Sequence, residues 1–215
     1  MTPRVRDMPA PRRAQGLVGP AMAKVFAWPF RLVLAGLLRA GVHPWHLTVI
    51  SLVGNVIAGW YLLTGRRFLP AVVLAIAGVL DVFDGSVARA RGEASRWGAF
   101  LDSTLDRIAD VIVFGALFWS LAEQGHRTSA ALALIALVAS FMVSQLRAEA
   151  EAAGVALTEG AVQRLERYVL LLIGLMVPGA LLPVLALLAA LGVLTAAQRA
   201  WSAWRRLAPS NGPAT

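Results

Sequence analysis

The sequence has no cysteine, and charged residues make up only 15% of its 215 residues. Without cysteine there is neither a disulfide framework nor a thiolate metal site. A soluble domain carries far more charge, about a quarter of its residues. Hydrophobic residues account for 58% of the chain instead, and the mean hydropathy is +0.68. The composition therefore predicts a polytopic membrane protein with one compact transmembrane domain.

Lysine is also nearly absent, because 19 of the 20 basic residues are arginine, and the formal net charge is +8. In a membrane protein this balance indicates contact with anionic lipids and phosphate groups, not with nucleic acid. The alternative is that most of the arginines are topology signals alone, since cytoplasmic loops are rich in Lys and Arg.

The N-terminal segment 1–19 is polar, proline-rich and basic, which predicts a flexible cytoplasmic tail. A transmembrane domain over 20–207 and a short tail over 208–215 follow. Within the domain, 21–41 carries basic residues at helical spacing and predicts an amphipathic helix in the membrane interface, anchored by Trp28 and Phe30. No signal peptide is expected, because basic residues interrupt this first apolar segment.

Six apolar segments predict six membrane-spanning helices, and there is no internal repeat. The predicted spans are 46–64, 68–90, 96–122, 128–150, 163–178 and 181–203. With the N-terminus inside, all but four of the 20 basic residues lie on the inner side. The positive-inside rule therefore predicts that both termini and the connections 89–96 and 147–167 face the cytoplasm.

Four carboxylates, those of Asp81, Asp84, Asp102 and Asp106, lie between strongly apolar flanks. Their spacings of three and four residues place each pair on one helix face, so we expect the carboxylates to converge where two helices meet at a turn. An acid in hydrocarbon costs roughly 2.5–3.5 kcal/mol on insertion scales. A cation would offset this cost, and carboxylates suit Mg²⁺ or Mn²⁺.

This stretch has the spacing D-x2-D-G-x2-A-R-x8-G-x3-D-x3-D. Eight fixed positions within 26 residues make a chance match improbable. In this spacing the chain resembles the CDP-alcohol phosphotransferase family. The matching residues are Asp81, Asp84, Gly85, Ala88, Arg89, Gly98, Asp102 and Asp106.

The resemblance implies metal-dependent transfer of a phosphatidyl group from CDP-diacylglycerol to a polar alcohol, with release of CMP, two metal ions and a homodimer. Asp81, Asp84 and Asp102 then bind metal, and Asp106 is the general base on the acceptor hydroxyl and a further metal contact. Gly98 is expected to allow close packing of two helices. The implied nucleotide-binding residues are Thr48, Asp81, Gly85, Ala88, Arg89, Ser95 and Gly98.

Three further residues near the motif are polar or charged. His43 and His46 lie in HPWHLT, which resembles the family's first-span entry except that Trp45 stands where Asn or Asp is common. We interpret both histidines as interfacial residues, because no other ligand accompanies them at metal-site spacing. Asp110 extends the face of Asp106 by one turn, and we expect it to pair with Arg107 or Arg89.

The acceptor is indicated by 144–167, which resembles the same region of phosphatidylinositol-phosphate synthases. The resemblance implies a pocket for a phosphomonoester such as inositol 1-phosphate. Arg147 replaces the usual lysine and Glu149 an arginine. Two alternatives stay open. The arginines of 144–167 could be topology signals in a cytoplasmic loop, or the pocket could bind glycerol 3-phosphate in a phosphatidylglycerol-phosphate synthase. The implied acceptor-phosphate residues are Ser144, Arg147, Arg164, Arg167 and Arg199.

Two other classes of function are less consistent with the sequence. A cation or proton transporter would also use intramembrane acids, but the acids lie toward one membrane face and no inverted repeat is present. A scaffold with an inactive enzyme fold is disfavoured, because all eight motif residues are intact. We expect a multi-pass enzyme of a prokaryotic cytoplasmic membrane with its active site facing the cytoplasm.

Overall fold

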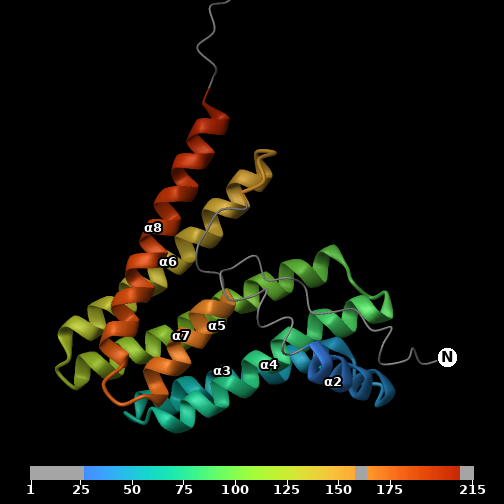
Figure 1. Ribbon diagram of the computed structural model, residues 1–215, viewed down its shortest axis with the longest axis horizontal. Coiled ribbons are helices and arrows are strands. Elements are labelled where there is room, and N and C mark those ends of the chain that lie inside the picture. The colour runs from blue at the N-terminus through green and yellow to red at the C-terminus, as the bar shows by residue number, and fades with distance from the viewer. Residues whose placement is uncertain (1–26, 158–163, 209–215) are drawn as a thin grey trace, which may run out of the picture.

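The computed structural model describes residues 27–157 and 164–208, which form seven α-helices and no strand (Figure 1). Each predicted segment overlaps one of these helices, with ends that differ by up to a few residues, and the all-α class is confirmed for these residues. The predicted N-terminal tail lies outside them. The helices are α2 (Ala27–Arg39), α3 (Pro44–Leu63), α4 (Phe68–Arg91), α5 (Arg96–Glu123), α6 (Arg127–Ala152), α7 (Arg164–Met176) and α8 (Leu181–Leu207).

Four of the described helices, α3, α4, α6 and α8, are long and apolar enough to cross a membrane. Helix α5 has 28 residues, but five charged residues lie in its first 15. Helix α7 has 13 residues, and at a rise of 1.5 Å per residue it is about 20 Å long. The hydrocarbon core of a bilayer is about 30 Å thick. The fold is therefore that of an integral membrane all-α protein, and spanning by α5 and α7 stays a prediction.

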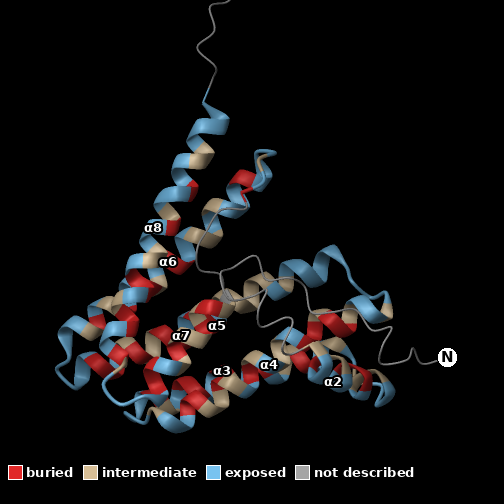
Figure 2. Ribbon diagram, viewed as in Figure 1, coloured by how far each residue is buried: buried red, intermediate tan, exposed pale blue. Residues whose placement is uncertain are grey.

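The helices pack closely where small residues face one another. A Cβ on Gly59 of α3 would lie 2.7 Å from Ile112 Cγ2 of α5, and a Cβ on Gly192 of α8 would lie 2.9 Å from Ala139 Cβ of α6. Small residues let membrane helices approach in this way. Large apolar side chains such as Trp60 remain on the outside, where Figure 2 shows exposed positions along the helices. This pattern suits a lipid-facing surface.

Helix α2 packs at the C-terminal end of α4, which carries the first half of the motif. The rings of Phe30 and Phe83 stack with centroids 4.8 Å apart. Leu34 and Val87 are fully buried in the same cluster, which Leu47 of α3 joins. The predicted helix within 21–41 is therefore present from Ala27 onward. Its location in the membrane interface stays a prediction.

Two regions of the fold carry the predicted site residues. Helices α3, α4 and the N-terminal half of α5 form what we call the carboxylate region. Helices α6, α7 and α8 form the arginine region, in which α6 and α8 lie side by side and extend beyond the other helices (Figure 1). Helix α5 contacts both α3 and α6, so it connects the two regions.

Candidate active site

A short turn joins the two halves of the acidic motif. Helix α4 ends at Gly92, whose φ of 72° is a left-handed conformation that glycine adopts without steric penalty. Helix α5 begins after Ser95, whose Oγ accepts a hydrogen bond from the Gly98 N–H at 3.0 Å. This is N-capping, which satisfies a free N–H of the first turn. The turn brings the acids at the end of α4 to those at the start of α5.

Three of the four predicted acids meet. Asp81, Asp102 and Asp106 each offer a carboxylate oxygen, and these oxygens lie within 4.8 Å of one another. Asp102 is exposed and the other two are partly buried. Three carboxylates at this distance repel one another unless a cation lies among them. Oxygen ligands of this type fit Mg²⁺ or Mn²⁺, so the residues present suit the predicted metal.

The fourth acid, Asp84, is oriented differently. It is 6% exposed and lies outside the group of three. Thr48 Oγ1 donates a hydrogen bond to Asp84 Oδ2 at 2.7 Å, and the Gly85 N–H donates to Oδ1. The convergence expected for four carboxylates is therefore seen for three. The contact with Thr48 ties α3 to α4 beside the cluster.

The predicted nucleotide-binding residues other than Thr48 of α3 lie along the end of α4, in the turn after it and at the start of α5. A Cβ on Gly85 would lie 3.2 Å from Arg89 Nη1, so the glycine leaves room for this guanidinium. Arg89 Nη2 donates to Ser86 Oγ at 3.1 Å. Ala88 lies in the last turn of α4, where its carbonyl accepts from the Glu93 N–H. The expectation that Gly98 permits close helix packing is wrong, because Ser95 Oγ is the one described atom within 4 Å of an added Cβ.

Among the described residues, neither His43 nor His46 belongs to the group of three carboxylates. His43 Nε2 lies 3.3 Å from a carboxylate oxygen of Glu93, and both side chains are exposed. The ring of His46 is 6.2 Å from that of His43. The contact joins the start of α3 to the turn between α4 and α5. The interpretation of both histidines as interfacial residues stays a prediction.

The predicted acceptor residues come from three helices, and two of them approach one turn of α6. Arg199 of α8 is 7% exposed and its Nη1 donates to the Val143 carbonyl at 2.7 Å. Arg167 of α7 donates from Nη1 to Ser140 Oγ. Ser144 lies one turn past Ser140 on α6 and is partly buried. Arg167 and Arg199 therefore contact the stretch of α6 that immediately precedes Ser144.

The other two arginines differ. Arg147 Nε is 2.8 Å from Glu151 Oε1 one turn later on α6, and both side chains are more than half exposed. This arginine pairs along its own helix and does not reach Arg167 or Arg199 in any contact that the structure shows. Arg164 begins α7, and its side chain lies outside the described residues.

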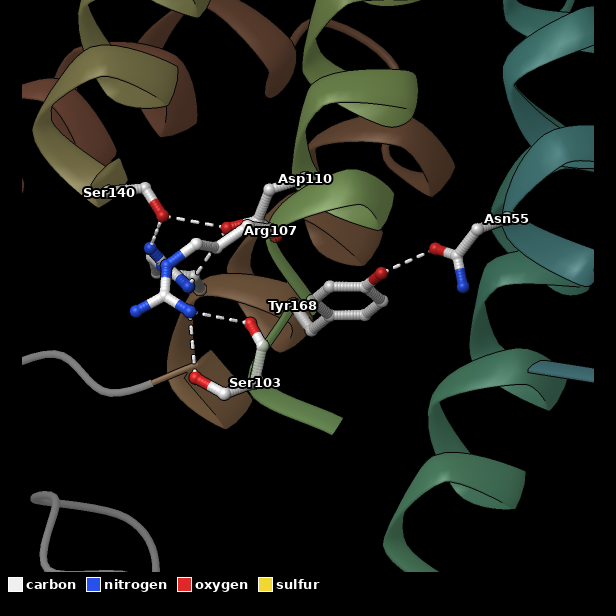
Figure 3. A network of polar contacts seen from close by, with 7 residues as sticks. Asn55, Ser103, Arg107, Asp110, Ser140 and Tyr168 are labelled. Atoms are coloured by element: carbon white, nitrogen blue, oxygen red, sulfur yellow. Dashed lines mark hydrogen bonds and ion pairs between the residues drawn. The ribbon is translucent and has the colours of Figure 1, made fainter. Parts of the chain in front are cut away.

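The expected partner of Asp110 was wrong. Asp110 Oδ2 lies 3.1 Å from Arg167 Nη2 and accepts from Ser140 Oγ at 2.7 Å. Arg107 instead donates from Nη1 to the carbonyl and the hydroxyl of Ser103, at 2.8 and 2.7 Å (Figure 3). Arg107 and Asp110 are only three residues apart in the sequence, but the arginine that pairs with Asp110 is 57 positions away.

Sequence reasoning also missed a polar contact beneath the cluster. Tyr168 of α7 donates its hydroxyl to Asn55 Oδ1 of α3 at 2.5 Å (Figure 3), and Asn55 Nδ2 donates to the Ser51 carbonyl at 2.8 Å. Ser51 and Asn55 line a small hollow together with Asp81 and Asp106. The signal was available, because polar residues recur at spacings of three and four from Thr48 along an apolar span.

Comparison with known proteins gives consistent matches. The sequence profile described as CDP-alcohol phosphatidyltransferase matches residues 41–204. The phosphatidylinositol phosphate synthase of Mycobacterium marinum is 37% identical over 179 residues, which cover 79% of this chain and 76% of that protein.

Solved structures agree with this similarity. The crystal structure of Mycobacterium tuberculosis phosphatidylinositol phosphate synthase with CDP-DAG bound has a TM-score of 0.75 at 33% identity, covering 85% of this chain and 97% of the other. The same enzyme in complex with manganese and citrate has a TM-score of 0.72 at 35% identity, covering 80% and 87%. Bacterial relatives and candidate membrane spans together indicate a prokaryotic membrane protein.

Proposed function

Because this chain belongs to the CDP-alcohol phosphatidyltransferase family, we propose that it transfers a phosphatidyl group from CDP-diacylglycerol to inositol 1-phosphate. The products are phosphatidylinositol phosphate and CMP. The observation that carries the proposal is the convergence of Asp81, Asp102 and Asp106 in a chain that has the fold of a synthase solved with CDP-DAG. The inositol phosphate acceptor follows from the relatives that share this fold.

The acids of the carboxylate region have two roles. Asp81, Asp84 and Asp102 are the residues that would hold Mg²⁺ or Mn²⁺, and Asp106 contributes a further oxygen. A relative has been solved with manganese, which agrees with this donor set. When bound, the metal supplies positive charge that neutralises the diphosphate of the CDP-lipid. To join the other ligands, the Asp84 carboxylate would rotate away from Thr48 or bind the metal through the lone pairs that its hydrogen bonds do not use.

The chemistry proper is a displacement at phosphorus. Asp106 accepts the proton of the acceptor hydroxyl as the new oxygen–phosphorus bond forms on the phosphatidyl phosphate. The bond between the two phosphates breaks, and CMP leaves with the bridging oxygen. Arg89, folded over Gly85 at the end of α4, provides positive charge for the diphosphate. Arg167, Arg199 and Ser144 hold the phosphate of the acceptor, with Arg164 and Arg147 as the remaining predicted contacts.

We also propose a finer arrangement in the membrane. Six helices span the bilayer, including α5 and α7, which pack against the other spans. Helix α2 lies in the membrane interface, and the active site faces the cytoplasm. The distribution of arginines supports it. Because the chain has no cysteine, single-cysteine variants label without background. Ala94→Cys should react only with a reagent inside the cell and Arg66→Cys with an impermeant reagent outside. Labelling of both from the same side would contradict the six-span topology.

A homodimer stays a prediction, which the mass of the protein in detergent would check.

CMP release by the purified protein tests the function. CDP-diacylglycerol and Mg²⁺ are supplied with inositol 1-phosphate, glycerol 3-phosphate, free inositol or serine in turn. Turnover with inositol 1-phosphate alone supports the proposal. Turnover with glycerol 3-phosphate keeps the mechanism and replaces the acceptor. No CMP with any of them would point to an acceptor alcohol that was not tested, or revive the transporter hypothesis.

A further inference from the structure

Asp110 lies one helical turn past Asp106 on α5, yet its contacts belong to the arginine region. It pairs with Arg167 of α7 at 3.1 Å and accepts a hydrogen bond from Ser140 of α6 at 2.7 Å. The side chains of Arg167 and Asp110 are 16% and 6% exposed, so water screens the pair poorly. Figure 3 shows Asp110 and Ser140 facing one another, with a dashed line between them. Asp110 is therefore the buried acid that holds an arginine of the predicted acceptor site.

The hydrogen-bonding capacity of this pair is not used up. A guanidinium has five N–H donors, and the contacts above use Nη1 and Nη2 once each. Arg167 Nε and Asp110 Oδ1 are buried without a hydrogen-bond partner among the residues that the structure describes. A small, mostly apolar cavity lies beside Arg167, which lines it together with Ser140. A phosphate that reaches Arg167 would meet a guanidinium that is already oriented and has N–H groups left to donate.

We propose that Asp110 is a positioning residue for the transfer reaction, acting by compensating the charge of the Arg167 guanidinium and holding it oriented toward the acceptor phosphate. The inference rests on the proposed function. A buried arginine without a counterion is strongly unfavourable, and removing one partner leaves the other charge uncompensated. Asp110 supplies that counterion without touching the acceptor itself.

The position of Asp110 also fixes a distance. Four residues along a helix correspond to a rise of about 6 Å, so the base Asp106 and the acid that holds Arg167 are separated by one rigid turn of α5. An acceptor anchored by its phosphate at Arg167 then presents to Asp106 a hydroxyl that is only a few bonds from that phosphate. Small phosphorylated polyols meet this condition, and an unphosphorylated polyol lacks the anchor.

Steady-state kinetics of the full-length protein test the role. We compare wild type, Asp110→Asn, Asp110→Glu and Ser140→Ala by CMP release at varied inositol 1-phosphate and at varied CDP-diacylglycerol. Loss of a hydrogen bond between charged groups predicts that Asp110→Asn raises the acceptor KM about tenfold or more. The KM for the CDP-lipid should stay unchanged, because the three-carboxylate group is intact. Asp110→Glu, which keeps the charge, should have an intermediate effect on the acceptor KM alone, and Ser140→Ala a small one.

A double variant separates positioning from general destabilisation. If Asp110 acts through Arg167, Asp110→Asn should add little to the acceptor KM of Arg167→Gln. Full addition of the two effects, or an equal rise of both substrate KM values in Asp110→Asn, would overturn the inference. Should Asp110→Asn fail to fold, the Asp110→Glu comparison decides, and an unchanged acceptor KM there counts against the proposal.

A thermal-unfolding experiment, which does not require catalytic turnover, tests this inference separately from the proposed function. Inorganic phosphate should raise the melting temperature of wild type, and Asp110→Asn should lose most of that shift. This readout holds whichever phosphorylated acceptor the enzyme uses, so a missing turnover with inositol 1-phosphate would refute the acceptor and leave the role of Asp110 standing. An equal phosphate shift in both proteins would refute Asp110 as a positioning residue.

Discussion

The carboxylate region and the arginine region differ in how their polar groups are satisfied. In the carboxylate region Asp81, Asp102 and Asp106 are at least partly exposed, and their carboxylate oxygens lie within 4.8 Å of one another. In the arginine region Arg167 and Arg199 are mostly buried and already bonded to Asp110, Ser140 and the Val143 carbonyl. In the proposed function, a cation completes the first arrangement. The second is largely completed by the protein itself.

This difference suggests different tasks. A group of like charges is stable only with its ligand, so the carboxylate region suits the metal and the charged diphosphate that comes with it. Buried arginines that are held in place before the substrate arrives suit recognition, because a prearranged fork loses less freedom when it binds a phosphate. Variants in the two regions should therefore affect chemistry and acceptor binding separately.

The largest effect is expected for the metal-binding acids. Asp81→Asn or Asp102→Asn should abolish CMP release, because each substitution removes one of the converging carboxylates that are proposed to bind the cation together. Glu123→Gln, an exposed acid at the other end of α5, is the matched control and should keep full activity. Retained turnover in either motif variant would break the assignment of this region to metal binding.

The next effect distinguishes the base from the ligands. Asp106→Asn should lower kcat by about 10²–10⁴-fold, the usual contribution of a general base. Binding of the CDP-lipid should persist, since Asp81 and Asp102 remain. Kinetics and direct lipid binding are measured on the same preparation. Loss of lipid binding together with activity would mean that Asp106 is mainly a ligand.

Arg167→Ala tests the recognition role of the arginine region. We expect the acceptor KM to rise tenfold or more, by loss of charged hydrogen bonds worth about 1.5–3 kcal/mol each. The KM for the CDP-lipid should change far less. Comparable changes in both values would argue against separate tasks for the two regions, since the variant would then disturb the bundle as a whole.

The sequence predicted the carboxylate region better than the arginine region, for a physical reason. Spacings of three and four along α4 and α5 determine which acids share a helix face, and Gly92 and Ser95 mark the turn between the helices. The local pattern was therefore enough to bring Asp81, Asp102 and Asp106 together. It was not enough for Asp84, because the rotation of α3 that places Thr48 beside it is set by packing between helices.

The partners of the arginine region depend on contacts between helices far apart in the sequence. Asp110 was expected to pair within or beside its own helix, but Arg167 reaches it from α7. Tyr168, the next residue, reaches Asn55 of α3 instead. Periodicity identified each helix to within a few residues, yet it carries no information about how neighbouring helices are rotated against one another. Whether α5 and α7 cross the membrane is similarly beyond what length and hydropathy determine.

A smaller effect is expected where the carboxylate region is supported from α3. Thr48→Val removes the hydroxyl that donates to Asp84, at a cost of about 1 kcal/mol for one hydrogen bond. We expect a severalfold loss of kcat/KM for the CDP-lipid and no change in the acceptor KM. Thr48→Ser, which keeps the hydroxyl, is the matched control. A change in the acceptor KM would show that the two regions are coupled through α3.

The smallest effect should come from Arg147, which resemblance places in the acceptor pocket and the structure places on an exposed turn with Glu151. Exposed pairs of this kind contribute about 0.2–1 kcal/mol, so Arg147→Ala should change the acceptor KM no more than about fivefold. Arg199→Ala, which removes a buried guanidinium bonded to the Val143 carbonyl, should raise it well above that. Both variants are measured with inositol 1-phosphate at saturating CDP-lipid. Equal increases in the acceptor KM would mean that Arg147 leaves Glu151 when the acceptor binds. The substrate would then assemble part of the arginine region, in contrast to the Asp110–Arg167 pair, which is formed beforehand.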